Sequence, residues 1–118
     1  MGGEFPQKTD KPWGYELLWA FTPLYAGKIF VIKKGHRLSL HYHEKKDETH
    51  HVYTGKVLAE MENSEGQLVQ FEASAGHCYR ILPNTKHRLK AIEDTVIFEV
   101  STPELEDTIR VEDDYGRA

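Results

Sequence analysis

Cysteine is almost absent from this chain, since Cys78 is the only one among 118 residues. A single thiol excludes a disulfide framework within one chain, and we expect it to be a small core residue. The start of the chain lacks the hydrophobic stretch of a signal peptide, so the expected location is the cytoplasm. No apolar run is long enough to cross a membrane. Nineteen acidic against fifteen basic residues give a net charge of −4 without a basic run, which argues against a nucleic-acid surface.

Helical spacing is also scarce, whereas short alternating or apolar runs recur between turn signals. The turn signal Asn63-Ser64-Glu65-Gly66 predicts a hairpin between two of these runs. Eight or nine short strands predict an all-β double-sheet barrel or jelly roll. The predicted strands lie near Tyr15–Phe21, Lys28–Lys34, Arg37–Tyr42, His50–Thr54, Lys56–Glu62, Gln67–Glu72, Cys78–Leu82, His87–Ala91 and Val96–Ser101.

The length of 118 residues fits one domain. We place this domain at residues 11–118 and predict that residues 1–10 form a flexible N-terminal segment without secondary structure. The tail from Thr108 to Arg117 is mostly polar but carries Ile109, Val111 and Tyr115. We therefore expect the tail to pack back on the barrel.

Histidine is the residue type that stands out. Gly35, His41, His43, Glu48 and Gly55 follow the order G-x5-H-x-H-x4-E-x6-G, and His87 lies further downstream. Independent draws at the chain's own composition give such a match with a probability on the order of 10⁻⁴. In a strand, residues i and i+2 point to the same face, so His41 and His43 project together.

The spacing predicts a metal site with ligands His41, His43, Glu48 and His87. Imidazole and carboxylate donors suit one divalent transition metal ion: Zn²⁺, Mn²⁺, Fe²⁺, Ni²⁺ or Co²⁺. A metal-free polar cluster inside a barrel is the alternative. By strand parity His50 points inward near the ion, and His51 points outward. Arg88 and Lys90 are expected on the solvated outer surface, because solvated surface is the default for such side chains.

The motif resembles the first conserved motif of the cupin superfamily. Gly76, Asn84 and His87 occupy positions of the second cupin motif, although Leu82 replaces the usual proline and Asn84 the usual glycine. Asn is the residue next best able to adopt a positive φ, so the turn is expected to survive. The resemblance implies a single-domain cupin, a double-stranded β-helix or jelly-roll barrel, with His87 as the fourth ligand.

A narrower resemblance comes from the two ends of the chain. The segments Lys11-Pro12-Trp13-Gly14-Tyr15-Glu16 and Asp113-Asp114-Tyr115-Gly116-Arg117 are similar to the ends of the cupin domain in type II phosphomannose isomerases. In that family the domain commonly follows a nucleotidyltransferase domain, for which 118 residues leave no room. Family members tend to carry glutamine at the position of His41 and an aromatic residue at that of His50.

The resemblance implies a metal-dependent aldose–ketose isomerase acting on mannose 6-phosphate or a related phosphorylated hexose. Such chemistry needs a base beside the carbon that loses a proton, and the candidates are Glu99, His50 and Tyr53. The phosphate needs cations or N–H donors, for which Arg117, Lys11 and Lys86 are candidates, with Arg117 favoured by the resemblance.

Two other functions remain open at this point, because a fold does not determine a function. One is an Fe²⁺- or Ni²⁺-dependent cupin oxygenase, and the other is a non-catalytic sugar-binding or regulatory cupin. The expected partners are a small-molecule sugar phosphate and a second copy of the chain in a homodimer, since exposed edge strands tend to be covered. No nucleic-acid or membrane partner is expected.

Overall fold

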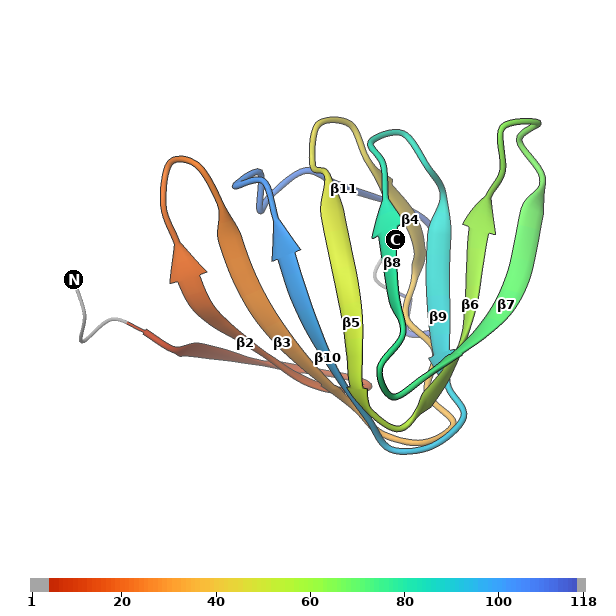
Figure 1. The fold of residues 1–118 in the computed structure, drawn as a ribbon, viewed down its shortest axis with the longest axis horizontal. Helices are drawn as coiled ribbons and strands as arrows, with labels where there is room; N and C mark the ends of the chain where they lie inside the picture. Colours follow the sequence, from red (N-terminus) through yellow and green to blue (C-terminus); the bar gives the residue numbers. More distant parts are fainter. Residues whose placement is uncertain (1–4, 117–118) are drawn as a thin grey trace.

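The computed structural model describes residues 5–116, which form eleven strands in two antiparallel sheets. The first sheet has the order β1-β2-β3-β10-β5-β8 and the second the order β11-β4-β9-β6-β7. Figure 1 shows the strands converging at the bottom of the view and spreading toward the top. The strands are β1 Gln7–Lys11, β2 Gly14–Phe21, β3 Ala26–Ile32, β4 Leu40–His43, β5 Glu48–Thr54, β6 Lys56–Glu62, β7 Leu68–Ser74, β8 Cys78–Ile81, β9 His87–Ala91, β10 Thr95–Ser101 and β11 Thr108–Glu112.

The predicted double-sheet all-β architecture is confirmed. The strands predicted at Lys56–Glu62 and His87–Ala91 have the predicted bounds, and the hairpin at residues 63–66 joins β6 to β7. In that turn Asn63 Oδ1 accepts hydrogen bonds from the backbone N–H groups of Glu65 and Gln67. Among residues 5–116 no helix is long and apolar enough to cross a membrane.

The second cupin-like turn also forms as predicted. Asn84 has a φ of 60°, so asparagine replaces glycine in a left-handed conformation. Its backbone N–H donates to the carbonyl of His43 at 2.6 Å. This bond ties the turn before β9 to the end of β4, and both of these strands carry predicted metal ligands.

Two strands lie where no strand was predicted. Strand β1 pairs with β2 over Gln7–Lys11, so the expectation that residues before position 11 lack secondary structure is wrong for residues 7–10. Strand β11 pairs with β4 at the edge of the second sheet. Beyond β11, Asp114 forms a bidentate ion pair with Arg37 at 2.8 and 2.6 Å, and the Tyr115 hydroxyl lies 2.8 Å from His36 Nδ1. The tail therefore packs on the barrel, as expected.

The hydrophobic core fills the narrow part between the sheets. It contains the buried residues Trp13, Phe30, Ile32, Val52, Val57, Ala73, Leu89, Ala91 and Ile97. Along the strands, buried and more exposed residues alternate. In β10, Ile97 is fully buried, while its neighbours Val96 and Phe98 are only partly buried. This alternation also turns Glu99 and Ser101 to the inner side, where Glu99 is 2% exposed.

Candidate metal centre

Three imidazoles converge between β4 and β9. His41 and His43 occupy alternate positions of β4, and His41 is the pairing partner of His87 in β9. The ring centroids lie 4.4 Å apart for His41 and His87, 5.0 Å for His41 and His43, and 5.5 Å for His43 and His87. One nitrogen of each ring lies within 4.8 Å of the others. The structure thus brings together the three predicted histidine ligands.

Hydrogen bonds orient two of these rings. The Nδ1 atom of His41 lies 2.9 Å from the carbonyl oxygen of Ser39, and that of His87 lies 2.8 Å from the carbonyl oxygen of Thr85. Because a carbonyl only accepts, Nδ1 carries a proton in both rings, and Nε2 is the nitrogen that a neutral ring would offer to an ion. A backbone carbonyl on the far nitrogen is the usual support of a metal-binding histidine.

Glu48 joins the imidazoles from the first sheet. Its Oε2 lies 3.1 Å from His43 Nε2, and its Oε1 lies 3.6 Å from His87 Nε2. Donor atoms bound to one ion at about 2.1 Å stand roughly 3.0–3.4 Å apart. The carboxylate is 2% exposed, so it is fixed within the barrel.

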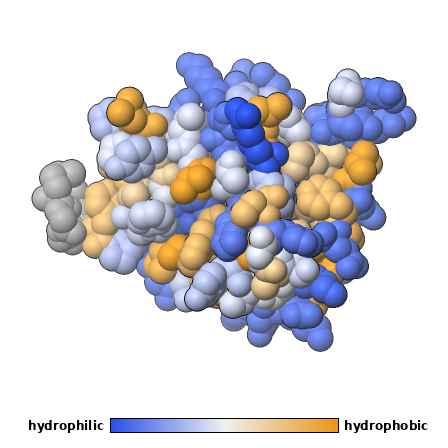
Figure 2. All heavy atoms as spheres, in the orientation of Figure 1, coloured by the Kyte–Doolittle hydropathy of each residue, from blue (hydrophilic) through white to orange (hydrophobic). Residues whose placement is uncertain are grey.

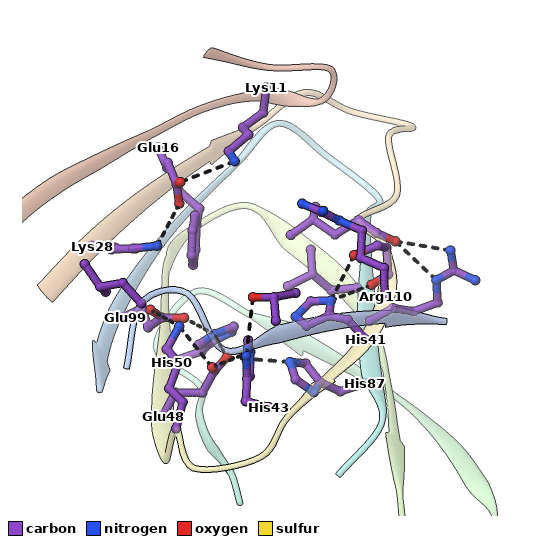
Figure 3. A pocket seen from close by; sticks show the side chains of 18 of the residues that line it. Lys11, Glu16, Lys28, His41, His43, Glu48, His50, His87, Glu99 and Arg110 are labelled. Carbon is purple, nitrogen blue, oxygen red and sulfur yellow. Dashed lines mark hydrogen bonds and ion pairs between the residues drawn. The ribbon is translucent and has the colours of Figure 1, made fainter. Parts of the chain in front are cut away.

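A second group of charged residues adjoins Glu48. His50 Nε2 lies 2.9 Å from Glu48 Oε1 and 3.1 Å from Glu99 Oε1. The ammonium group of Lys46 lies 3.3 Å from Glu48 Oε2 and 3.1 Å from Glu99 Oε2. Figure 3 shows this group beside the three imidazoles. All four side chains are buried, which is costly for charges unless they are paired.

The pKa shifts separate the two groups. Burial, helped by the nearby His87 and His43, holds the pKa of His41 well below its usual range, which favours the neutral imidazole that a metal needs. Burial alone would raise the pKa of Glu48, but contacts with His43, His50 and His87 outweigh it and lower that pKa. Glu48 is therefore a carboxylate.

His50 shifts in the opposite direction from His41. Burial opposes its charge, but Tyr79, Glu48 and Glu99 outweigh the burial and raise the pKa of His50 well above its usual range. The pKa of Lys46 is also raised, since Glu99 and Glu48 outweigh its burial. The contacts of the second group therefore favour the charged forms of His50 and Lys46.

The residues around the three imidazoles fit a metal ion. Among residues 5–116, buried His87 Nε2 has no hydrogen-bond partner, and the carboxylate oxygen that approaches it, Glu48 Oε1, lies 3.6 Å away. Buried polar atoms are normally satisfied, so a shared ligand is a direct explanation. Three imidazole nitrogens and one carboxylate form a donor set that Zn²⁺, Mn²⁺, Fe²⁺, Ni²⁺ and Co²⁺ accept.

These groups line a cavity of about 290 Å³. Thr108 and Arg110 of β11 line it from the side of β4, where they pair with His43 and His41. Lys11 and Lys28 line the other wall, and both approach Glu16, at 3.5 and 3.3 Å. Figure 3 shows these lysines across the cavity from Arg110. Sequence reasoning missed Arg110 because β11 was not recognised as a strand.

The other predicted site residues lie in different places. Glu99, His50 and Lys11 line the cavity. Tyr53 shares the outward parity of His51: it is 56% exposed, stacks on Phe98 and is not among the residues that line the cavity. Lys86 lies just before β9 and is not among the cavity residues; its backbone N–H donates a hydrogen bond to the Glu62 carboxylate. Arg117 lies outside the described residues.

The structure tests the expected exposure of three further side chains. Arg88 was expected in solvent but is only 6% exposed. Its guanidinium donates to the carbonyl of Leu38 at 3.2 Å and lies close to the tail residue Asp114, and these two residues cover it. Lys90 is exposed as expected. Cys78, expected in the core, is exposed with its Sγ 3.0 Å from His51 Nδ1.

A scan of protein-family models and a search of curated protein sequences found no match to the chain. Solved structures do match. KdgF from Halomonas sp. is 23% identical with a TM-score of 0.74, and the match covers 86% of this chain and 89% of that one. Oxalate decarboxylase from Bacillus subtilis is 15% identical with a TM-score of 0.79, covering 93% and 31%.

The capsular polysaccharide assembling protein CapF from Staphylococcus aureus is 18% identical with a TM-score of 0.74, covering 90% of this chain and 32% of CapF. The chain thus spans most of KdgF but about a third of the two longer proteins. None of the three is a phosphomannose isomerase, so the narrower resemblance stays a prediction. What the three share with this chain is the architecture: the protein has the cupin fold.

Proposed function

We propose that this cupin is a metal-dependent isomerase that interconverts an aldose phosphate and a ketose phosphate, with mannose 6-phosphate or a related phosphorylated hexose as substrate. One observation carries the proposal. In a single cavity, three converging histidines lie beside two buried carboxylates: Glu48, which contacts His43 and approaches His87, and Glu99, which contacts none of the three. Isomerisation needs both an electrophile for the substrate oxygens and a separate base.

His41, His43, His87 and Glu48 would hold the ion. A divalent ion bound there polarises carbonyl and hydroxyl oxygens and offsets the negative charge that develops when a proton leaves the neighbouring carbon. Four protein ligands leave one or two positions for the substrate. The cavity of about 290 Å³ limits the substrate to a small molecule.

Glu99 is the base that we favour. Its register partners are His50 on β5 and Lys28 on β3, so the sheet itself places it on the inner wall. His50 and Lys46 contact its two oxygens at 3.1 Å each and fix the carboxylate in place. His50 is the alternative proton carrier, but its raised pKa favours an imidazolium that donates a proton rather than accepting one.

Arg110 is the phosphate anchor that we favour among the described residues. It lines the cavity from the exposed edge strand β11, directly beside His41. Lys11 is a second cation but shares Glu16 with Lys28, so much of its charge is already compensated. An arginine fork matches the geometry of a phosphate group. Arg117, favoured by the sequence resemblance, follows β11 by five positions and stays a prediction.

The comparisons support this proposal at the level of fold and general chemistry. Oxalate decarboxylase is an enzyme by name, and CapF assembles capsular polysaccharide by name, so the same architecture serves reactions on small acids and on carbohydrates. The low identities leave the substrate of this chain to experiment.

The test is an assay for fructose 6-phosphate formed from mannose 6-phosphate after metal removal and addition of each candidate ion in turn. Turnover that requires Zn²⁺, Mn²⁺ or Co²⁺ is the expected result. Oxygen consumption with Fe²⁺ or Ni²⁺ would replace the proposal with an oxygenase. Tight binding of sugar phosphate without turnover by any ion would replace it with a sugar-binding cupin.

A further inference from the structure

Lys46 is the only buried lysine among residues 5–116, and it is 5% exposed. The other lysines of this range reach solvent at least in part, and hydrophilic residues cover much of the surface seen in Figure 2. A lysine is almost never fully buried unless it is paired. The position of Lys46 inside the barrel must therefore be explained by the charges around it.

Lys46 and His50 bridge the same two carboxylates. The Lys46 ammonium group lies 3.3 Å from Glu48 Oε2 and 3.1 Å from Glu99 Oε2. His50 Nε2 lies 2.9 Å from Glu48 Oε1 and 3.1 Å from Glu99 Oε1. Figure 3 shows Glu48, His50 and Glu99 turned toward one another. Each carboxylate therefore offers one oxygen to the lysine and the other to the histidine.

Apart from the lysine, this group has the composition of a second metal site. Glu48, His50 and Glu99 are all buried, and each offers one ligand atom within 4.8 Å of those of the other two. The two spacings from His50 Nε2 are close to those of donors that share one ion. Glu48 Oε2 also lies 3.1 Å from His43 Nε2, so Glu48 belongs to both groups. In two-metal enzymes the ions stand about 3.5–4 Å apart, a separation that one shared carboxylate can span.

We propose that the inner charges are arranged for two cations: one divalent ion at the three imidazoles, and the Lys46 ammonium group in the place of a second metal ion. Lys46 then limits the centre to one ion and keeps Glu99 free of metal. A carboxylate whose lone pair binds a divalent ion is a poor base, so Lys46 acts as a positioning residue that reserves Glu99 for proton transfer. The role of Glu99 rests on the proposed function, whereas the number of bound ions does not depend on the substrate.

The loop before β5 fixes Lys46 in this place. Its backbone N–H donates to Asp107 Oδ2 at 3.0 Å, and the N–H of the next residue, Asp47, donates to Thr102 Oγ1 at 3.0 Å. The N–H of Thr102 donates back to the carbonyl of Asp47 at 3.0 Å. These hydrogen bonds tie the loop to the segment that follows β10, the strand that carries Glu99. The backbone thus holds the lysine beside the two carboxylates, which is what a permanent internal cation requires.

The experiment counts the Mn²⁺ ions bound per chain by elemental analysis after dialysis. Lys46→Ala leaves Glu48 and Glu99 without their shared cation, so it should bind two ions where wild type binds one. Lys46→Arg keeps the charge and should bind one. Lys28→Ala is the matched control, because Lys28 lines the same cavity but pairs with Glu16, and it should also bind one. Electron paramagnetic resonance should show a spin-coupled pair of Mn²⁺ ions in Lys46→Ala alone.

Removing a buried cation can also unfold the chain. If Lys46→Ala is unfolded without metal, added Mn²⁺ should restore the circular dichroism spectrum of a β protein with two ions bound; a variant that stays unfolded at millimolar Mn²⁺ would overturn the proposal. So would one ion in folded Lys46→Ala, two ions in wild type, or two in Lys28→Ala. A wild type that binds no ion would remove the metal centre as well, so failure of the proposed function is distinguishable from failure of this inference alone.

Discussion

Beside the cavity, the two faces of the first sheet reverse the usual distribution of charge. On the inner face, Lys28, Glu99 and His50 lie side by side across β3, β10 and β5. One position before Glu99 on β10, the outer face presents Phe98 paired with Ile29 and His51. Soluble proteins usually bury the apolar side and expose the charged one. Here the same strand turns a carboxylate inward and aromatic surface outward.

The buried charges and the exposed apolar residues each indicate a surface suited to binding. Buried charges are stable only when they are paired or bind an ion, so the inner face identifies a chemical site. Exposed apolar surface is stabilised when another surface covers it, so an outer face of this kind is typical of an interaction site. The two sides of one sheet therefore differ in chemistry: paired charges face the cavity, and apolar surface faces outward.

The largest effect should follow from replacing Glu99, the inner carboxylate that lies apart from His41, His43 and His87. Glu99→Gln keeps the size of the side chain but removes the base, so kcat should fall by about 10²–10⁴. Bound metal should stay the same. Glu106→Gln alters a carboxylate at the mouth of the same cavity and serves as the control. Unchanged kcat in Glu99→Gln would remove Glu99 from the mechanism.

Neighbouring residues of β10 allow the two faces to be compared by stability. Ile97 is fully buried on the inner side, so Ile97→Ala should lower the free energy of unfolding by about 2–5 kcal/mol. Phe98→Ala on the outer face should cost less, because Phe98 is only half-buried. Urea unfolding measures both losses. A loss for Phe98→Ala as large as that for Ile97→Ala would mean that Phe98 belongs to the core.

A smaller effect is expected at the rim of the cavity. Arg110→Ala removes charge-assisted hydrogen bonds worth about 1.5–3 kcal/mol, so KM for the sugar phosphate should rise by roughly 10- to 100-fold. Steady-state kinetics with Arg80→Ala, an arginine on the outer rim of the sheet, provide the control. Equal KM values for Arg110→Ala and wild type would assign the phosphate to another cation, such as Lys11.

Most strands were predictable because short alternating or apolar runs lie between turn signals. Lys56–Glu62 and His87–Ala91 have the predicted bounds, and His41, His43 and His87 meet as their parity requires. Strands β1 and β11 were missed because their residues are mostly polar and their pairing depends on neighbours distant in sequence.

The missed site residues have the same explanation. Arg110 faces the cavity only because β11 pairs with β4, and Arg88 is buried only because the tail and Leu38 cover it. Lysine is almost never fully buried, so nothing in the sequence marked Lys46, which becomes buried by pairing with Glu48 and Glu99. Local pattern identifies elements, whereas tertiary contact decides which polar residues enter a site.

The most direct test of the central claim, that the inner charges of this cupin hold one metal ion, is elemental analysis by mass spectrometry after dialysis against each candidate ion. Wild type should bind one ion per chain. His43→Ala and His87→Ala should bind at least 100-fold more weakly while the circular dichroism spectrum stays that of a folded β protein. Unchanged stoichiometry in both variants, or no ion in wild type with any of the five metals, would contradict the account.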